Sequence, residues 1–340
     1  MIRDALNNFP QQFGYEPKIE NESALKRLDK FIVCGMGGSH LAADLLKIWK
    51  PDVDVIIHKD YGLPPLTNED LESRLLILSS YSGNTEEVID SFERGKSRGL
   101  AMAIIAVGGK LLTLAKEENI PYIQLPDTGV QPRMALGFSF RALLKLIAAE
   151  SALRETDNLK NLPAADLEIR GEALAARLKG MIPVIYSSQQ NYGIAYNWKI
   201  KFNETGKIPA FCNVFPELNH NEMNGFDAME GTRELSQKFH FIFLRDREDD
   251  PRIGKRMAVL ERLYRDRGFE VDVFDLDGET VFRKIFASLL LADWAAMYIA
   301  ETYSVEAEQV PMVEEFKKLI TSEAGPKIFK EKGIEAPTSS

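Results

Sequence analysis

The sequence has few residues that would suit a disulfide framework or a metal site. It contains only two cysteines, Cys34 and Cys212, and both lie in apolar stretches typical of strands. Thiols in such stretches are usually buried and reduced. The histidines and cysteines also lack the clustered spacing of metal ligands. Neither a disulfide nor a bound metal is therefore expected.

Long apolar runs and long basic runs are absent as well. No apolar stretch approaches the roughly 18 residues that indicate a membrane span, and the start, Ile2-Arg3-Asp4, lacks the apolar core of a signal peptide. Acidic residues number 51 against 42 basic ones, which gives a net charge of −9. This charge argues against nucleic acid or an anionic membrane as a partner. We therefore expect a soluble cytoplasmic protein.

What the chain does have is a regular alternation of strand and helix patterns. Its 340 residues exceed one usual core, which predicts two domains. The strands expected in the first half are 31–34, 53–57, 75–79, 102–107 and 121–125, and the expected helices are 39–49, 84–98, 110–118 and 134–153. This order is typical of a doubly wound α/β domain with a parallel sheet.

The second half repeats the alternation less regularly. Its expected strands are 183–187, 209–214, 240–244 and 270–275, and its expected helices are 168–180, 190–205, 251–267 and 280–302. Residues 154–166 are polar and contain a proline, so we predict a linker there, between an N-terminal domain 1–153 and a C-terminal domain 167–320. The tail 321–340 is expected to be loose at its end.

A loop rich in hydroxyl groups follows the third expected strand. Ser79-Ser80-Tyr81-Ser82-Gly83-Asn84-Thr85 comes directly after an apolar run, and a helix pattern begins at Glu86. Hydroxyl donors, a glycine and the free N–H groups of a helix start form a cradle for an anion such as a phosphate monoester. The alternative is an ordinary strand-to-helix turn in which Asn84 or Thr85 caps the helix.

A glycine-rich loop follows the first expected strand and allows two interpretations. Gly35 and Gly37 fit the first two positions of a dinucleotide-binding fingerprint, and Asp60 follows at a suitable distance. The third glycine position is occupied by His40, whose bulk opposes the close packing of helix and strand. Ser39 instead supplies a hydroxyl at the helix start, which suits a sugar phosphate.

Two titratable residues of the second half are candidates for chemistry. Glu204 ends a predicted helix, where the negative end of the helix dipole makes a carboxylate more basic, as a general base requires. His220 lies between Asn219 and Asn221, which could fix its tautomer. On spacing alone, the simpler alternative is favoured, in which Glu204 is a solvated helix end and His220 is the neighbour of an N-cap.

Together these motifs resemble a known family. Gly35–Ser39 and Ser80–Thr85 are similar to the loops of the SIS (sugar isomerase) fold. The contexts of Arg133, Glu204 and His220 narrow the resemblance to the bifunctional phosphoglucose/phosphomannose isomerases. The sequences that carry it are Gln131-Pro132-Arg133-Met134-Ala135-Leu136-Gly137-Phe138-Ser139-Phe140, Lys201-Phe202-Asn203-Glu204, Asn219-His220-Asn221-Glu222, Phe9-Pro10-Gln11-Gln12 and Val310-Pro311-Met312-Val313-Glu314-Glu315-Phe316-Lys317. The similarity extends from about residue 4 to 320 of this sequence.

The resemblance implies an architecture and a set of site residues. It implies two SIS domains, each a flavodoxin-like doubly wound parallel sheet flanked by helices, in a homodimer with shared active sites to which the partner subunit contributes a histidine, the partner's His220. Glu204 would move a proton between C1 and C2 of the sugar, Arg133 would stabilise the cis-enediolate, and His220 with Lys317 would serve ring opening. No metal or nicotinamide cofactor would be required. The residues implied to bind the sugar phosphate are Gly37, Gly38, Ser39, Ser80, Ser82 and Thr85.

The implied activity is the interconversion of glucose 6-phosphate and mannose 6-phosphate with fructose 6-phosphate, in glycolysis and gluconeogenesis. Two departures from the family pattern bear on it: His40 replaces a small residue and would narrow the loop or add a donor, and Ser304–Gln309 differs from the usual segment near the sugar. A non-catalytic SIS regulator that binds a sugar phosphate, or an isomerase of another phosphosugar, remains an alternative.

Overall fold

The computed structural model describes residues 2–321. The described residues fall into two compact units, which divide between Ala307 and Glu308. The described part of the second unit contains one helix, α13 (Pro311–Thr321). All other helices and strands named below belong to the first unit.

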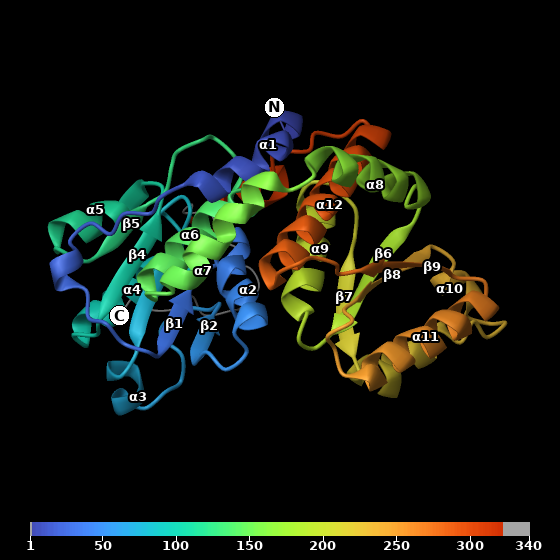
Figure 1. Ribbon diagram of the computed structural model, residues 1–340, viewed down its shortest axis with the longest axis horizontal. Helices are drawn as coiled ribbons and strands as arrows, with labels where there is room; N and C mark the ends of the chain where they lie inside the picture. Colours follow the sequence, from blue (N-terminus) through green and yellow to red (C-terminus); the bar gives the residue numbers. More distant parts are fainter. Residues whose placement is uncertain (1, 322–340) are drawn as a thin grey trace, which may run out of the picture. The chain divides into compact units, whose positions relative to one another are not determined.

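The first half of the large unit contains a five-stranded parallel sheet (Figure 1). Its strands are β1 (Phe31–Cys34), β2 (Val55–His58), β3 (Leu75–Ser79), β4 (Met102–Ala106) and β5 (Tyr122–Gln124), in the order β2-β1-β3-β4-β5. After β1 the chain adds β2 on one side and β3 on the other. The carboxyl ends of β1 and β3 therefore form the switch point at which parallel α/β sheets bind ligands.

Helices cover both faces of this sheet. The helices of this half are α1 (Ile2–Asn7), α2 (Leu41–Trp49), α3 (Asn68–Glu72), α4 (Glu86–Ser97), α5 (Gly109–Glu117), α6 (Leu136–Leu146) and α7 (Glu150–Glu155). Alternate strand residues enter different cores: Ile32 and Leu76 cluster with Phe92 of α4, whereas Val33 and Ile77 belong to the cluster that contains α2 and α6. This alternation is the pattern of strands that are buried on both faces.

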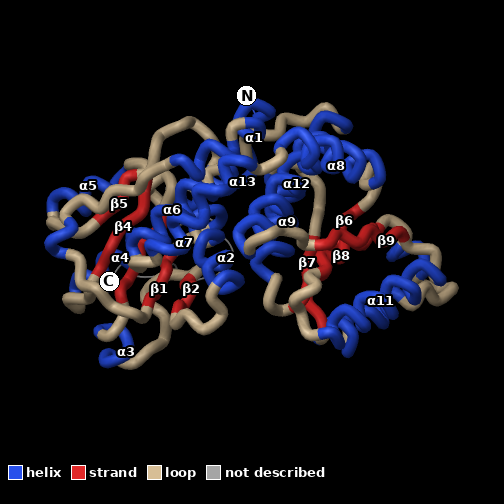
Figure 2. Tube along the Cα trace, in the orientation of Figure 1, coloured by secondary structure: helices blue, strands red, loops and turns tan. Residues whose placement is uncertain are grey.

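The second half contains a four-stranded parallel sheet in the order β7-β6-β8-β9, and Figure 2 shows its strands in red beside helix α11. The strands are β6 (Ile182–Ser188), β7 (Phe211–Phe215), β8 (Phe239–Arg245) and β9 (Glu270–Asp275). The helices are α8 (Ala164–Arg177), α9 (Tyr192–Glu204), α10 (Arg233–Ser236), α11 (Pro251–Asp266) and α12 (Val281–Thr302). The predicted fold class, two parallel sheets flanked by helices, is confirmed.

The apolar helix α12 is the central packing element of the large unit. It contacts α8 and α9 of its own half and α1 and α2 of the first half. By length and composition it could cross a membrane, but 72% of its most apolar window is buried inside the protein. Its side chains belong to one continuous cluster that also includes residues of α2, α6 and α9. Its hydrophobicity is therefore accounted for by the core.

Two stretches differ from the sequence-based expectation. The helix predicted over 134–153 is two helices, α6 and α7, because the chain turns at Ala148, whose φ is +57°. The predicted linker 154–166 is not extended: it contains the 3₁₀ helix η5 (Thr156–Asn161) and the start of α8, and Thr156 and Leu159 are buried. The domain boundary placed there stays a prediction. The tail 321–340 lies, from residue 322 onward, outside the described residues.

Candidate active site

Two loops meet at the switch point of the first sheet. The glycine loop after β1 forms a short 3₁₀ turn, η3 (Gly37–Ser39), and the hydroxyl loop follows β3. Ser79 Oγ donates to the backbone oxygen of Ser39 at 2.8 Å, and Ser39 Oγ accepts from the backbone N–H of Tyr81 at 2.9 Å. These bonds hold the glycine loop and the hydroxyl loop against each other.

The hydroxyl loop is also bonded internally. Ser80 Oγ and Thr85 Oγ1 are 2.7 Å apart, and Ser80 Oγ accepts from the N–H of Gly83 at 3.1 Å. Thr85 occupies the N-cap position of α4 but makes no capping bond with its side chain. Ser82 is exposed, and its Oγ accepts from the N–H of Asn84 at 3.3 Å. Ser82 therefore presents its hydroxyl to solvent, whereas Ser80 organises the loop.

Gly83 is a position that only glycine can occupy in this loop. Its φ is +71°, and a Cβ built there would lie 1.8 Å from the backbone oxygen of Gly108. The chain after β3 can therefore pass beside the chain after β4 because Gly83 has no side chain.

His40 is an interior residue between the two halves. It is 1% exposed, its Nδ1 lies 2.7 Å from Asp44 Oδ2, and its ring centroid is 5.7 Å from that of Tyr196 on α9. The close backbone approach occurs two residues earlier: a Cβ on Gly38 would lie 2.8 Å from the backbone nitrogen of Arg133. The glycine loop is thus packed directly against the turn that carries Arg133.

Arg133 joins three parts of the chain at one point. It lies in η4 (Pro132–Met134) and is 1% exposed. Its Nη1 is 3.3 Å from Glu204 Oε2, its Nε donates to Thr205 Oγ1 at 2.8 Å, and its Nη2 donates to the backbone oxygen of Ala307 at 2.9 Å. A guanidinium with its donors fixed in this way keeps one orientation.

The charges at this point are partly shielded from water. Burial lowers the pKa of Arg133, and the negative charges of Glu204 and Asp293 oppose that effect. Burial also lowers the pKa of Lys207, whose Nζ donates to the backbone oxygen of Glu204. The Glu204 side chain is 32% exposed, so a ligand can reach its carboxylate. A reachable carboxylate beside a fixed cation can move a proton and stabilise an oxyanion.

Among the described residues, the structure brings Arg133 and Glu204 together but does not join His220 to Glu204. His220 ends the 3₁₀ helix η6 (Glu217–His220) and is exposed. Within residues 2–321, no hydrogen bond or ion pair joins His220 to Glu204. Lys317 lies on α13 in the C-terminal unit, where it pairs with Glu314 at 2.8 Å.

Comparison with known proteins decides the family. Residues 168–320 match the model of the bacterial phospho-glucose isomerase C-terminal SIS domain. A bifunctional phosphoglucose/phosphomannose isomerase of Aquifex aeolicus is 32% identical over 95% of this chain and 99% of its own length. One of Caldicellulosiruptor bescii is 31% identical over 92% and 97%, respectively. The chain belongs to the bifunctional phosphoglucose/phosphomannose isomerase family. The predicted resemblance is thereby confirmed.

Solved structures support the fold of this isomerase independently. The C-terminal domain of glucosamine-fructose-6-phosphate aminotransferase from Francisella tularensis superposes with a TM-score of 0.66. The alignment covers 91% of this chain and 96% of that chain at 14% identity. At this identity the likeness concerns the fold alone.

The candidate site includes three contributors that sequence reasoning did not identify. Thr205 and Ala307 accept hydrogen bonds from Arg133, and Lys207 donates to the backbone of Glu204. Thr205 and Lys207 follow Glu204 closely, and that proximity is the only signal the sequence offers. Ala307 acts through its backbone oxygen, which its residue type does not indicate. Among residues 2–321, no group of three or more His, Cys, Asp or Glu side chains could hold a metal ion.

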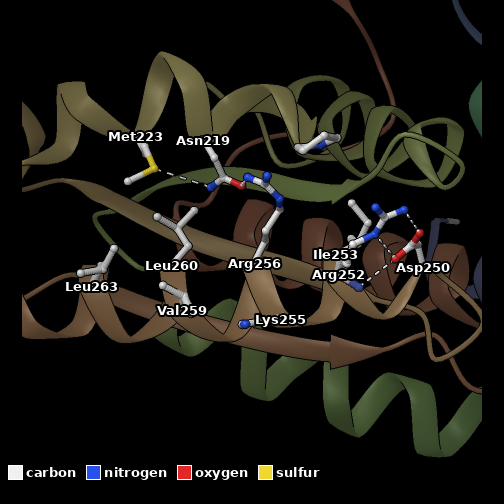
Figure 3. A pocket seen from close by; sticks show the side chains of 11 residues that line it. Asn219, Met223, Asp250, Arg252, Ile253, Lys255, Arg256, Val259, Leu260 and Leu263 are labelled. Carbon is white, nitrogen blue, oxygen red and sulfur yellow. Dashed lines mark hydrogen bonds and ion pairs between the residues drawn. The ribbon is translucent and has the colours of Figure 1, made fainter.

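A separate pocket of about 670 Å³ lies between η6 and α11 (Figure 3). Asn219 on its wall accepts from Arg256 at 3.3 Å, and Met223 and Leu260 supply apolar surface. Its lining residues do not include Arg133 or Glu204. This pocket is therefore distinct from the Arg133–Glu204 site.

Proposed function

We propose that this isomerase interconverts glucose 6-phosphate and mannose 6-phosphate with fructose 6-phosphate by a metal-independent proton transfer. The observation that carries the proposal is the 3.3 Å contact between the buried Arg133 guanidinium and the reachable Glu204 carboxylate, beside the glycine loop. The substrates are those that the names of its relatives state. The alternative is a regulatory SIS protein that binds a sugar phosphate but does not catalyse a reaction.

The proposed reaction moves one proton between neighbouring carbons. Glu204 removes the proton from C2 of the open-chain aldose, and the C2–H electrons form the C1=C2 bond while O1 becomes negative. Arg133 stabilises that oxyanion. O1 then receives a proton, the O2 hydroxyl loses one to become the ketone, and Glu204 returns its proton to C1. The phosphate would be held by the backbone of Gly37 and Gly38.

The hydroxyl groups that complete the proposed phosphate site come from both loops. They belong to Ser39, Ser80, Ser82 and Thr85. His220 and Lys317 would open the sugar ring in this proposal, with the histidine supplied as His220 of the partner subunit of a cytoplasmic homodimer. Both side chains are exposed, which is compatible with contact to a ligand.

Isotope exchange tests the function directly. Incubation of glucose 6-phosphate with the protein in deuterated water should place solvent deuterium at C1 of fructose 6-phosphate and, on reversal, at C2 of the aldose. Nuclear magnetic resonance of both sugars measures it. Binding of the sugar without any exchange would favour the regulator, and no binding would exclude both.

The proposed phosphate site makes a prediction for Ser82. Ser82→Ala should raise KM for the phosphosugar by about 5- to 150-fold, which corresponds to about 1–3 kcal/mol for a hydrogen bond to a charged group. kcat should change little. Ser97→Ala is the control, because Ser97 is also exposed but lies at the other end of α4. An unchanged KM in Ser82→Ala would count against this phosphate site.

The proposed dimer makes a second prediction. Mixed dimers of Glu204→Gln and His220→Ala subunits should regain up to about a quarter of wild-type activity after subunit exchange, because half of the dimers are mixed and each holds one complete site. Activity and exchange are measured on the same samples. If exchange is complete and activity does not return, each site is built within one chain.

A further inference from the structure

A buried ion pair lies next to the Arg133–Glu204 site. Lys201 Nζ on α9 is 2.7 Å from Asp293 Oδ2 on α12, and each side chain is only 2% exposed. Removing two charges from water costs about as much free energy as their attraction returns. Fold stability is therefore a weak explanation for the pair, and its position suggests another role.

The pair is connected to Glu204 through the last turn of α9. Lys201 precedes Glu204 by three residues, so the two lie on neighbouring turns of one helix face. The backbone oxygen of Lys201 accepts from the N–H groups of Thr205 at 2.9 Å and Gly206 at 3.1 Å, which ends the helix. Thr205 in turn accepts the Nε–H of Arg133. Movement of Lys201 would therefore displace both Glu204 and Arg133.

The pair also balances charge in this region. Burial raises the pKa of Asp293, while the positive charges of Lys201 and Arg133 lower it. Two cations, Arg133 and Lys201, thus face two carboxylates, Asp293 and Glu204. This set is neutral when Glu204 is ionised, and it stays balanced when Glu204 takes a proton and the substrate becomes an enediolate.

Other charged or titratable groups act on the same region and must stay constant in any test. Glu306 and Lys207 interact electrostatically with Arg133, and Lys207 also donates to the backbone of Glu204. Tyr196 on α9 interacts electrostatically with Glu204. None of these groups touches the Lys201–Asp293 pair through a hydrogen bond within the described part of the chain.

We propose that Lys201 and Asp293 are a positioning pair that holds the last turn of α9 against Arg133 and sets the basicity of Glu204. This inference rests on the proposed function. The pair touches neither reacting carbon and acts through Glu204 and Arg133. Its effect is recognised by the direction in which the pH profile of kcat/KM moves when one of the two charges is removed.

The two single variants should shift the pH profile in opposite directions. Asp293→Asn keeps the hydrogen bond but leaves two cations against one carboxylate, so the acid limb of kcat/KM should move to lower pH. Lys201→Gln leaves an extra carboxylate, so the acid limb should move to higher pH. Each shift should be about one pH unit or more for charges within roughly 12 Å at an effective dielectric constant of about 20. The double variant restores neutrality and should return the limb to its wild-type position.

Matched controls come from a second lysine–aspartate pair, formed by Lys284 of α12 and Asp246 in the loop after β8. Lys284 Nζ lies 3.0 Å from Asp246 Oδ1, and the two side chains are 10% and 11% exposed. Lys284→Gln and Asp246→Asn should leave the acid limb in place. Shifts of the same sign in both test variants, no shift, or a double variant that stays displaced would overturn the proposal.

Failure of a variant to fold, and failure of the proposed function itself, can both be told apart from failure of this inference. If one single variant does not fold, the other decides: an acid limb that moves in the stated direction, and returns in the double variant, supports the pair's role, and an unmoved limb contradicts it. If the wild-type protein exchanges no deuterium into the sugar, the proposed function fails. If it exchanges deuterium and the profiles do not diverge, only this inference fails.

Discussion

Replacing Glu204 by glutamine should lower kcat by about 10²–10⁴-fold, the range for loss of a general base. Glutamine keeps the shape of the side chain and can still accept a hydrogen bond from Arg133 Nη1, which lies 3.3 Å from Glu204 Oε2. It cannot accept the carbon-bound proton. KM should therefore change by only a few-fold. Steady-state kinetics with glucose 6-phosphate, and deuterium exchange into the same sugar, measure both parts of this expectation.

The matched control is Glu155→Gln. Glu155 is, like Glu204, the last residue of a helix and is partly buried, but it ends α7. Its replacement should leave kcat within about two-fold of wild type, as expected for a substitution away from the site. Near wild-type turnover of Glu204→Gln with either sugar would show that the base, and with it the proposed mechanism, is wrong.

The same substitution addresses the second sugar. Mannose 6-phosphate presents the opposite configuration at C2, so one base can serve both sugars only if the substrate rotates about C2–C3 in the site. If Glu204 serves both, kcat should fall by similar factors with each. Ala307, within the segment that departs from the family pattern, accepts from both Arg133 and Lys207. A difference between the two sugars would therefore be expected to originate in that segment.

The sheet architecture could be predicted because its strands are buried on both faces. Continuous apolar runs such as Leu75–Leu78 and Phe31–Cys34 have no polar face that could belong to a surface helix, and each became a central strand. Long helices such as α11 and α12 were recognised from their apolar periodicity. Apolar runs and apolar periodicity depend only on residues that are close in the chain, so they can be read from a single sequence.

The remaining elements depend on contacts that a local pattern does not contain. The segment 154–166 is polar in composition, yet Thr156 is buried because its Oγ1 accepts from Arg141 and donates to the backbone of Leu153. The turn at Ala148 has no glycine or proline to mark it. In both cases tertiary hydrogen bonds and packing decided the conformation.

The candidate site was only partly accessible to sequence reasoning. Arg133 and Glu204 are 71 residues apart, and no spacing rule joins them; the family resemblance selected both. The hydroxyl loop, in contrast, could be inferred from its position after a buried strand. Lys201 and Asp293 gave no signal, because a lysine in a helix is usually solvated, and burial of this pair depends on two helices about 90 residues apart.

Substitution of Arg133 should lower kcat about as strongly as substitution of Glu204. The loss should depend on the shape of the Arg133 side chain as well as on its charge. Arg133→Lys keeps a positive charge but cannot donate at once to Glu204, Thr205 and Ala307. We expect kcat to fall by about 10²–10³-fold, the range for loss of a donor to a developing oxyanion. Arg133→Met should be at least as impaired, because it also leaves buried acceptors without a donor.

Arg141→Lys separates this catalytic effect from a loss of packing. Arg141 is also 1% exposed and also bonds several parts of the chain, including Tyr15, Thr156 and Asp157, but it lies in α6. Its replacement should lower the melting temperature and leave kcat of the folded enzyme unchanged. Arg133→Lys should lower kcat even at temperatures where the variant is fully folded. Full turnover of folded Arg133→Lys would mean that the guanidinium holds the two halves of the chain together without stabilising the enediolate.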